Sequence, residues 1–184
     1  MAAYLVLLLA ALSRLLPHAL HGHGLNFTAV GAGLLFFGAR RSRWQALVAA
    51  GVMAVSDYYL TTQVYGYPFQ VSSYLVTWAW YAAVCLTGSV VLRKVTALRV
   101  VAGVLASATS FFLVSNFAVW AGSQVSYTHD LRGLSACYAA GVPFYMNDLA
   151  STGLVAGLLF GLPVLAERMV EWMRSMENRN TPLV

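Results

Sequence analysis

The amino-acid sequence predicts an all-α fold, a single polytopic membrane domain of six transmembrane helices with both chain termini in the cytoplasm. Three observations predict this class. Of the 184 residues, 60% are hydrophobic and 9% are charged, whereas a soluble domain has about 25% charged residues. Apolar stretches of helical length follow one another, and basic residues fall between alternate stretches. This composition excludes a soluble globular domain, a disordered chain and a nucleic-acid-binding protein.

A helix needs about 20 mainly apolar residues to cross a bilayer. Six stretches approach this length, and the predicted spans are residues 2–20, 27–39, 44–61, 73–92, 100–121 and 147–166. The first stretch has no basic residues before it and no clear cleavage site after it. It is therefore predicted to be a retained helix and not a signal peptide.

The basic residues predict the orientation of these spans, because cytoplasmic loops of membrane proteins are enriched in Lys and Arg. Nine of the eleven basic residues fall on one side of the six-span arrangement: Arg40, Arg41, Arg43, Arg93, Lys94, Arg99, Arg168, Arg174 and Arg179. The opposite side holds Arg132, and Arg14 lies within the first span. We therefore expect a multi-pass protein of the bacterial inner membrane, in contact with the lipid bilayer. The net charge of +5 then reflects orientation and attraction to anionic lipid headgroups.

Two segments lie outside the predicted spans. Residues 122–146 form an outer loop, whose glycines and apolar segments predict a packed, lid-like structure. In the cytoplasmic tail, residues 167–184, charged and apolar side chains are interleaved, which predicts an amphipathic helix at the inner membrane surface. A solvated helical end fits this pattern equally well.

Polar residues within the spans define the candidate site, since ionisable groups inside a membrane are costly and indicate function. The candidates lie toward the outer side and are Arg14, Asn26, Asp57, Asn116, Asn147 and Asp148. They predict an outward-facing pocket for a small polar solute. Arg14 would meet an anionic group, and the acids would meet amines or hold Arg14. In the alternative interpretation, Arg14 and Asp57 form a structural ion pair and Asn116 caps loop backbone.

Aromatic residues crowd the same outer side, where they could stack on a flat ligand or form an interface belt. Other signals are weak. His18, His21 and His23 have no carboxylate or thiol beside them, so no metal site is predicted. Cys85 and Cys137 are not expected to form a disulfide. No nucleotide-binding loop or hydrolase motif occurs, so neither a cofactor nor an enzymatic activity is predicted.

Small residues recur at four-residue spacing, a pattern that lets membrane helices approach closely. The stripes consist of Gly153, Gly157 and Gly161, of Ala46, Ala50 and Ala54, and of Ala29 and Gly33. They predict packing within the bundle or, alternatively, docking surfaces for a partner membrane protein. Pro163 predicts a kink, because proline removes one backbone hydrogen bond.

Two stretches of the chain resemble an uncharacterised bacterial family of membrane proteins labelled as transport proteins. Residues 12–39 read LSRLLPHALHGHGLNFTAVGAGLLFFGA, similar to the R-x-x-P-H turn and NFTPVGA of that family. Residues 110–161 contain SNFAVW, GLSACY and GVPFYMN, similar to its SNFxVW, GLxxCY and IPFFxN. Ala29 replaces the usual proline, a His-Gly-His-Gly insert lengthens the first loop, and residues 127–129 replace a Tyr-Pro pair.

The hydropathy of that family is similar to that of the substrate-binding S subunits of energy-coupling-factor transporters. This resemblance implies six helices, cytoplasmic termini and a ligand pocket near the outer face. It also implies docking to a partner through the inner halves of the first three spans. The S-subunit Ala-x-x-x-Ala pattern is only partly matched here by Ala3, Leu7 and Ala11.

The favoured function is that of a membrane transport protein that binds a small solute from outside, as a transporter's substrate-capture subunit or as a solo carrier. The alternative is a non-transporting accessory or scaffold subunit of a larger membrane complex. An intramembrane enzyme is a third, less favoured class, because no nucleophile lies beside a base at matching depth.

Overall fold

The structure, a computed structural model, describes residues 1–19, 27–122 and 127–180, and every regular element within them is helical. The helices are α1 (Ala2–Ser13), α2 (Leu16–Ala19), α3 (Val30–Arg40), α4 (Ala46–Tyr59), α5 (Leu75–Val91), α6 (Ala97–Gly122) and α7 (Leu131–Asn180). They are joined by two 3₁₀ turns, η1 (Arg43–Gln45) and η3 (Val71–Ser73), and by a π-helical turn, η2 (Leu60–Val64). The predicted all-α class is confirmed.

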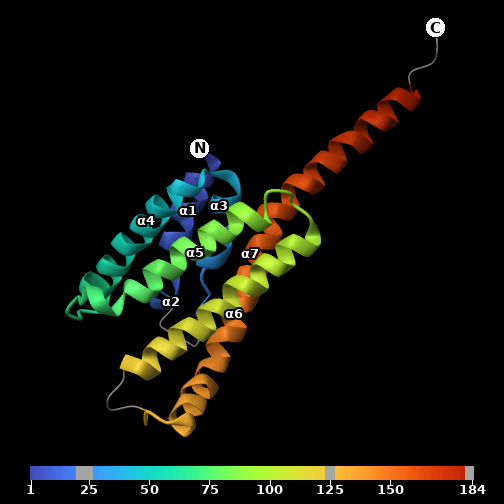
Figure 1. Cartoon of the computed structure of the whole chain (residues 1–184). Coiled ribbons are helices and arrows are strands. Elements are labelled where there is room, and N and C mark those ends of the chain that lie inside the picture. The colour runs from blue at the N-terminus through green and yellow to red at the C-terminus, as the bar shows by residue number, and fades with distance from the viewer. Residues whose placement is uncertain (20–26, 123–126, 181–184) are drawn as a thin grey trace.

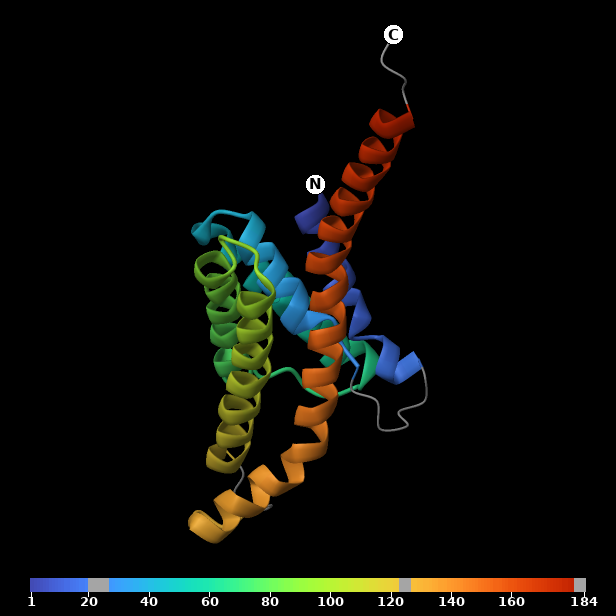
Figure 2. The same cartoon turned by 90° about the vertical axis from the view of Figure 1, so that its right-hand side faces the viewer.

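The helices form two neighbouring groups (Figure 1). α1, α3, α4 and α5 pack together, while α6 and α7 run antiparallel and contact that group through α3 and α5. The α3–α4 connection, the α5–α6 connection and the N-terminus lie at one end of the bundle (Figures 1 and 2). α2, the α4–α5 connection and the start of α7 lie toward the other end, and the last part of α7 extends away from the bundle.

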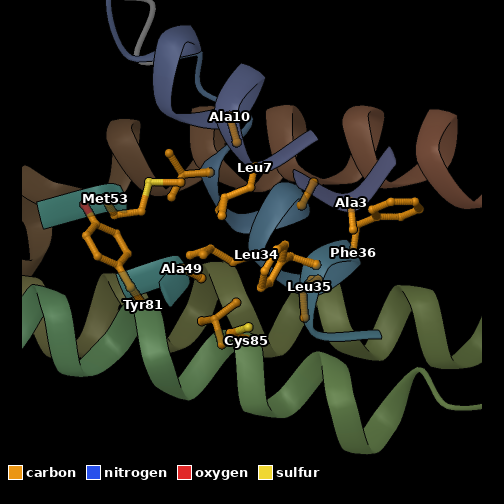
Figure 3. Packing of buried hydrophobic residues seen from close by; sticks show 14 of the residues in the cluster. Ala3, Leu7, Ala10, Leu34, Leu35, Phe36, Ala49, Met53, Tyr81 and Cys85 are labelled. Atoms are coloured by element: carbon orange, nitrogen blue, oxygen red, sulfur yellow. The ribbon is translucent and has the colours of Figure 1, made fainter. Parts of the chain in front are cut away.

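α3 is the central helix of the first group. Its residues from Val30 to Gly38 are all buried, as expected for a helix that is apolar on every side. Figure 3 shows Leu7 of α1, Leu34 of α3, Ala49 of α4 and Cys85 of α5 meeting in one core. The core therefore surrounds a helix of only 11 residues.

Two glycines bring α3 and α5 into backbone contact. A methyl group built on Gly38 would collide with the backbone carbonyl of Cys85, and one built on Gly88 would collide with that of Leu35. Glycine at both positions lets the two helix axes approach more closely than any other residue would allow. The α3–α5 contact therefore depends on these two positions.

The six-span membrane arrangement is not confirmed by the helix lengths. Two helical segments are long and apolar enough to cross a membrane, Ala97–Gly122 and Leu131–Met176. α1, α3 and α5 are apolar but have 12, 11 and 17 residues. At a rise of 1.5 Å per residue, α1 and α3 are shorter than the ~30 Å hydrocarbon core. The first predicted span also breaks at Arg14, after which α2 begins at Leu16.

The predicted lid-like loop over residues 122–146 is wrong from residue 131 onward, because α7 begins at Leu131 and runs without a break into the predicted sixth span. Asp130 explains where the helix starts. Its Oδ1 accepts hydrogen bonds from the backbone N–H of Gly133 and from the hydroxyl of Thr128, each at 2.7 Å. This is an N-cap, which satisfies a backbone donor that the helix leaves unpaired.

The Asp130 cap predicts a pH-dependent contribution to stability. The Gly133 N–H and then the Thr128 hydroxyl hold the pKa of this exposed carboxyl below its usual 3.8. The cap is therefore fully effective above the unfolded-state pKa and is lost as the pH falls through the lower folded-state pKa. We expect Asp130→Asn, which keeps an acceptor but does not titrate, to reduce the loss of melting temperature between about pH 6 and about pH 3. Thermal unfolding followed by circular dichroism measures this. Equal acid sensitivity of both proteins would remove Asp130 as a contributor.

Among the described residues, the predicted glycine stripe of residues 147–166 has a neighbour only at Gly153, where an added methyl group would lie 3.9 Å from the Val104 side chain of α6. Gly157 and Gly161 have no neighbouring atom within 4 Å of an added methyl group, whereas Ala156 and Phe160 on another face of α7 are buried. By contrast, Gly33 packs against Ala10 of α1, as the packing interpretation predicts. Gly157 and Gly161 therefore lie off the buried face of α7.

Two further features bear on the predictions for helix shape and packing. α7 changes direction in its orange first third and again where it turns red, the stretches that contain Pro143 and Pro163 (Figures 1 and 2). In the second stripe, Ala46 is buried while Ala50 and Ala54 are half-buried.

Candidate functional site

A partly enclosed cavity of about 340 Å³ lies where α1, α3, α4, α5, α6 and α7 meet. Its polar lining includes Arg14, Thr28, Asp57, Thr61, Ser115, Asn116 and Asp148. Its aromatic lining consists of Tyr65, Tyr74, Trp80, Tyr81, Phe111, Phe112, Phe144 and Tyr145. Aromatic walls with a few convergent polar groups are typical of a small-molecule site.

One wall of the cavity carries an ion pair. Arg14 Nη2 donates to Asp57 Oδ1 at 2.5 Å, and Arg14 Nη1 donates to the hydroxyl of Ser56 at 3.1 Å. Asp57 also accepts hydrogen bonds from Trp78 Nε1 at 2.9 Å and from the hydroxyl of Tyr81 at 3.5 Å. Its side chain is 2% exposed and that of Arg14 is 19% exposed. The predicted ion pair is thus present, and it lies within the predicted pocket.

The chain around the ion pair is held by local hydrogen bonds. Ser13 accepts a hydrogen bond from the backbone N–H of Ala29 at 2.9 Å, which joins the end of α1 to the start of α3. On the other side, Thr61 in the π-helical turn donates to the backbone carbonyl of Asp57 at 2.7 Å. The Thr61 hydroxyl is also 2.6 Å from that of Tyr74. Such π-helical turns occur frequently at functional sites.

The aromatic residues nearest the ion pair pack mainly on one another. The rings of Phe69 and Tyr74 stack with centroids 4.9 Å apart, and Trp78 stacks on both. Trp78 also donates to Asp57, so this stack positions a partner of the buried carboxylate. The stack is therefore part of the support of the ion pair.

The opposite wall comes from α6 and α7. Asn116 Nδ2 donates to the backbone carbonyl of Phe112 at 2.8 Å, so its amide bonds within α6 and the prediction that it caps loop backbone is wrong. Gly141 of α7 lies directly against it, since an added methyl group would be 2.5 Å from Asn116 Oδ1. Asp148 is half-buried, and its Oδ1 is 3.5 Å from the Thr152 hydroxyl. Among the described residues, the ion pair is that of Arg14 with Asp57, so Asp148 has no cationic partner there.

The cavity brings together four of the six candidate residues, Arg14, Asp57, Asn116 and Asp148. Asn147 precedes Asp148 in α7 but is not part of the cavity lining. Asn26 lies outside the described residues. A binding role for these residues stays a prediction.

Several lining residues carry no distinctive sequence signal. Thr61 and Thr28 are small hydroxyl residues, which are too common in apolar helices to single out. Gly31 also lines the cavity, and a methyl group built there would lie 2.8 Å from the hydroxyl oxygens of Ser107 and Thr152. The buried Ser107 hydroxyl has no hydrogen-bond partner among the described residues.

An apolar groove of about 430 Å³ lies beside the cavity, between α5 and α6. Trp80 lines both spaces, and its Nε1 donates to the hydroxyl of Ser110 at 2.9 Å. The sequence also contains two cysteines and a group of histidines. Cys85 and Cys137 are both free and buried. The described residues contain no group of three metal-ligating side chains, and His21 and His23 lie outside them.

Comparison with protein families assigns this chain to a family. Residues 1–174 match the model of a family of unknown function, DUF6580, and the chain belongs to that family. Neither a curated protein nor a solved structure matches the chain.

Proposed function

We propose that this member of the DUF6580 family is a multi-pass protein of the bacterial inner membrane that binds a small cationic solute in the cavity beside Asp148. It would act as the substrate-capture subunit of a transporter or as a solo carrier. The observation that carries the proposal is the charge of the cavity wall. Asp57 already neutralises Arg14, while Asp148 has no cationic partner among the described residues.

The chemistry of the lining favours an amine over an anion. A carboxylate in a partly buried site gains most from a cation that replaces its lost hydration. The faces of Tyr, Trp and Phe rings also attract cations, at about 0.5–2 kcal/mol per contact. Trp80, Phe112 and Tyr145 supply such rings in the same cavity as Asp148. We therefore propose that the cavity binds a solute and does not catalyse a reaction.

Three features support a membrane location. Two helical segments are long and apolar enough to span a bilayer. Large apolar side chains are exposed on the outward faces of other helices, including Leu5, Leu8, Leu47 and Val55. Contiguous exposed apolar surface of this kind indicates contact with lipid or another protein. The basic α3–α4 and α5–α6 connections lie at one end of the bundle, which we assign to the cytoplasm.

Native mass spectrometry of the protein purified in mild detergent tests the proposal. We expect a small amine bound to the wild-type protein. Asp148→Asn should weaken its binding by about tenfold or more, because it removes the charge that pairs with the amine. Glu167→Gln is the matched control, since it makes the same change in α7 outside the cavity lining. Equal ligand occupancy in all three proteins, or no bound small molecule in any, would overturn the assignment.

A second candidate function is that of an accessory subunit of a larger membrane complex. It is favoured by Gly157 and Gly161 on α7, where no described neighbour lies within 4 Å of an added methyl group. A stoichiometric protein partner and an empty cavity in the same mass spectra would support this function instead.

A further inference from the structure

A second charged cavity lies at the other end of α3 from Arg14. It has a volume of about 340 Å³ and is formed where the α3–α4 connection meets the end of α5. Figure 2 shows the two connections that follow α3 and α5 side by side at this end. The polar residues of the lining are Arg41, Ser42, Arg43, Ser89 and Arg93.

The positive charge of this cavity is not compensated within the described chain. Three arginines line it, and no described aspartate or glutamate does. The ion pair of the described residues, between Arg14 and Asp57, belongs to the other cavity. Three guanidinium groups around one space repel one another, and their combined field concentrates anions there.

The Arg41 side chain packs against an aromatic ring and has a hydrogen-bond donor without an acceptor in the described part of the chain. Its guanidinium carbon lies 4.3 Å from the centroid of the Tyr4 ring, and Tyr4 packs edge-on against Phe37. The Nε atom of Arg41 is buried without a hydrogen-bond partner among the described residues. A buried donor that stays unpaired costs about 1–3 kcal/mol, which an oxygen acceptor would recover.

The combination of three guanidinium groups, one of them held against the Tyr4 ring, and no described acidic partner matches the chemistry of phosphate. A guanidinium presents a planar set of donors that fits two phosphate oxygens at once. We propose that the cavity at Arg41, Arg43 and Arg93 binds a phosphate group. This site is separate from the solute cavity and does not depend on the function proposed for it.

The surroundings of the cavity point to phospholipid as the favoured source of that phosphate. Trp44, the residue after Arg43, is 66% exposed, and Leu98 at the start of α6 is 80% exposed. Tryptophan is enriched at the membrane–water interface, where lipid phosphates lie. A soluble phosphate compound offers the same oxygens, so the experiment must separate the two sources.

The test uses the full-length protein, purified in detergent and stripped of lipid. We expect detergent-solubilised phosphatidylglycerol to raise the melting temperature by roughly 5 °C, and diacylglycerol, which lacks the phosphate, to have no such effect. Inorganic phosphate forms a separate arm. If it produces the same shift, the site takes a free phosphate; if it does not, the phosphate is taken as part of a lipid.

Charge-matched variants locate the effect. Arg41→Gln, Arg43→Gln and Arg93→Gln combined should abolish the shift. Combined replacement by glutamine of three basic residues outside the lining should retain it: Arg99, Arg168 and Arg174. If the first triple variant does not fold, Arg93→Gln alone, at an exposed position, should still reduce the shift. Equal shifts in the two triple variants, an unchanged shift in Arg93→Gln, or equal shifts with phosphatidylglycerol and diacylglycerol would overturn the proposal.

Discussion

Asp57→Ala is expected to reduce the free energy of unfolding by about 3–5 kcal/mol, the usual cost of breaking a buried ion pair by removing one partner. The carboxylate is 2% exposed and accepts hydrogen bonds from Arg14, Trp78 and Tyr81. Its removal leaves the Arg14 guanidinium without its counter-charge and two ring donors without their acceptor. Equilibrium unfolding in detergent measures the loss.

A double-mutant cycle separates the ion pair from the rest of the site. The cycle consists of Arg14→Met, Asp57→Leu and the two combined, and the double variant should be less destabilised than the sum of the two single variants, because no uncompensated charge is then buried. Ser56→Ala is the milder control, since Ser56 contributes one hydrogen bond at 3.1 Å to Arg14. If the single variants at Arg14 and Asp57 had additive effects, the two side chains would not be coupled and this view of the site would be wrong.

Gly38→Ala is expected to be the second most damaging of these substitutions. The added methyl group collides with the backbone carbonyl of Cys85, which cannot move unless α3 and α5 separate. Overpacking of this kind costs about 1–3 kcal/mol and can cost more when backbone must shift. Gly88→Ala, which meets the carbonyl of Leu35 from the other helix, should have a similar effect.

The same substitution elsewhere provides the control. Gly51 of α4 and Gly157 of α7 have no neighbouring atom within 4 Å of an added methyl group. Alanine there should be neutral or stabilising by about 0.5–1 kcal/mol, because alanine is the better helix former. The melting temperatures should therefore fall in Gly38→Ala and Gly88→Ala and stay unchanged or rise in Gly51→Ala and Gly157→Ala. A stable Gly38→Ala protein would show that the α3–α5 contact is looser than the structure indicates.

The apolar composition of the sequence predicts the helical class. The same composition makes the residues of the candidate site easy to identify. Few polar residues occur in the apolar stretches, so each of them is conspicuous. Arg14, Asp57, Asn116 and Asp148 are therefore identifiable from the sequence alone, and they line one cavity. The hydrogen-bond partners of Asp57 cannot be identified in this way, because Trp78 and Tyr81 have no sequence feature that distinguishes them from other aromatic residues of a membrane protein.

Most of the predicted outer loop, from Leu131 onward, is helical in the structure. Composition is therefore a poor guide to helix boundaries. Asp130 is a residue type that favours the N-cap position, and the structure shows it capping the start of α7. Gly133 and Gly141 contributed to the prediction of a packed, lid-like loop, yet both lie inside α7. Glycine at these positions reflects close neighbours, Thr128 and Asn116, and not chain flexibility.

The S-subunit resemblance implied docking through the inner halves of the first three spans, and one part of that surface, the small-residue face of α1, is covered in the fold. Ala3, Leu7 and Ala11 on α1 are buried, at 4%, 2% and 9% exposure, in the core around α3. A partner cannot reach this face without displacing α3. The small-residue pattern on α1 therefore serves packing within the bundle.

By itself, the sequence determined the helical class, the polar residues of the candidate site and the grouping of basic residues in alternate connections, because each is a property of composition and spacing along the chain. Tertiary structure decided which helices touch. It placed the short α3 at the centre, set Gly38 and Gly88 against facing carbonyls, and brought Arg41 and Arg93 to one cavity. These outcomes depend on contacts between residues far apart in sequence, and the spacing of residues along one helix does not specify its neighbour.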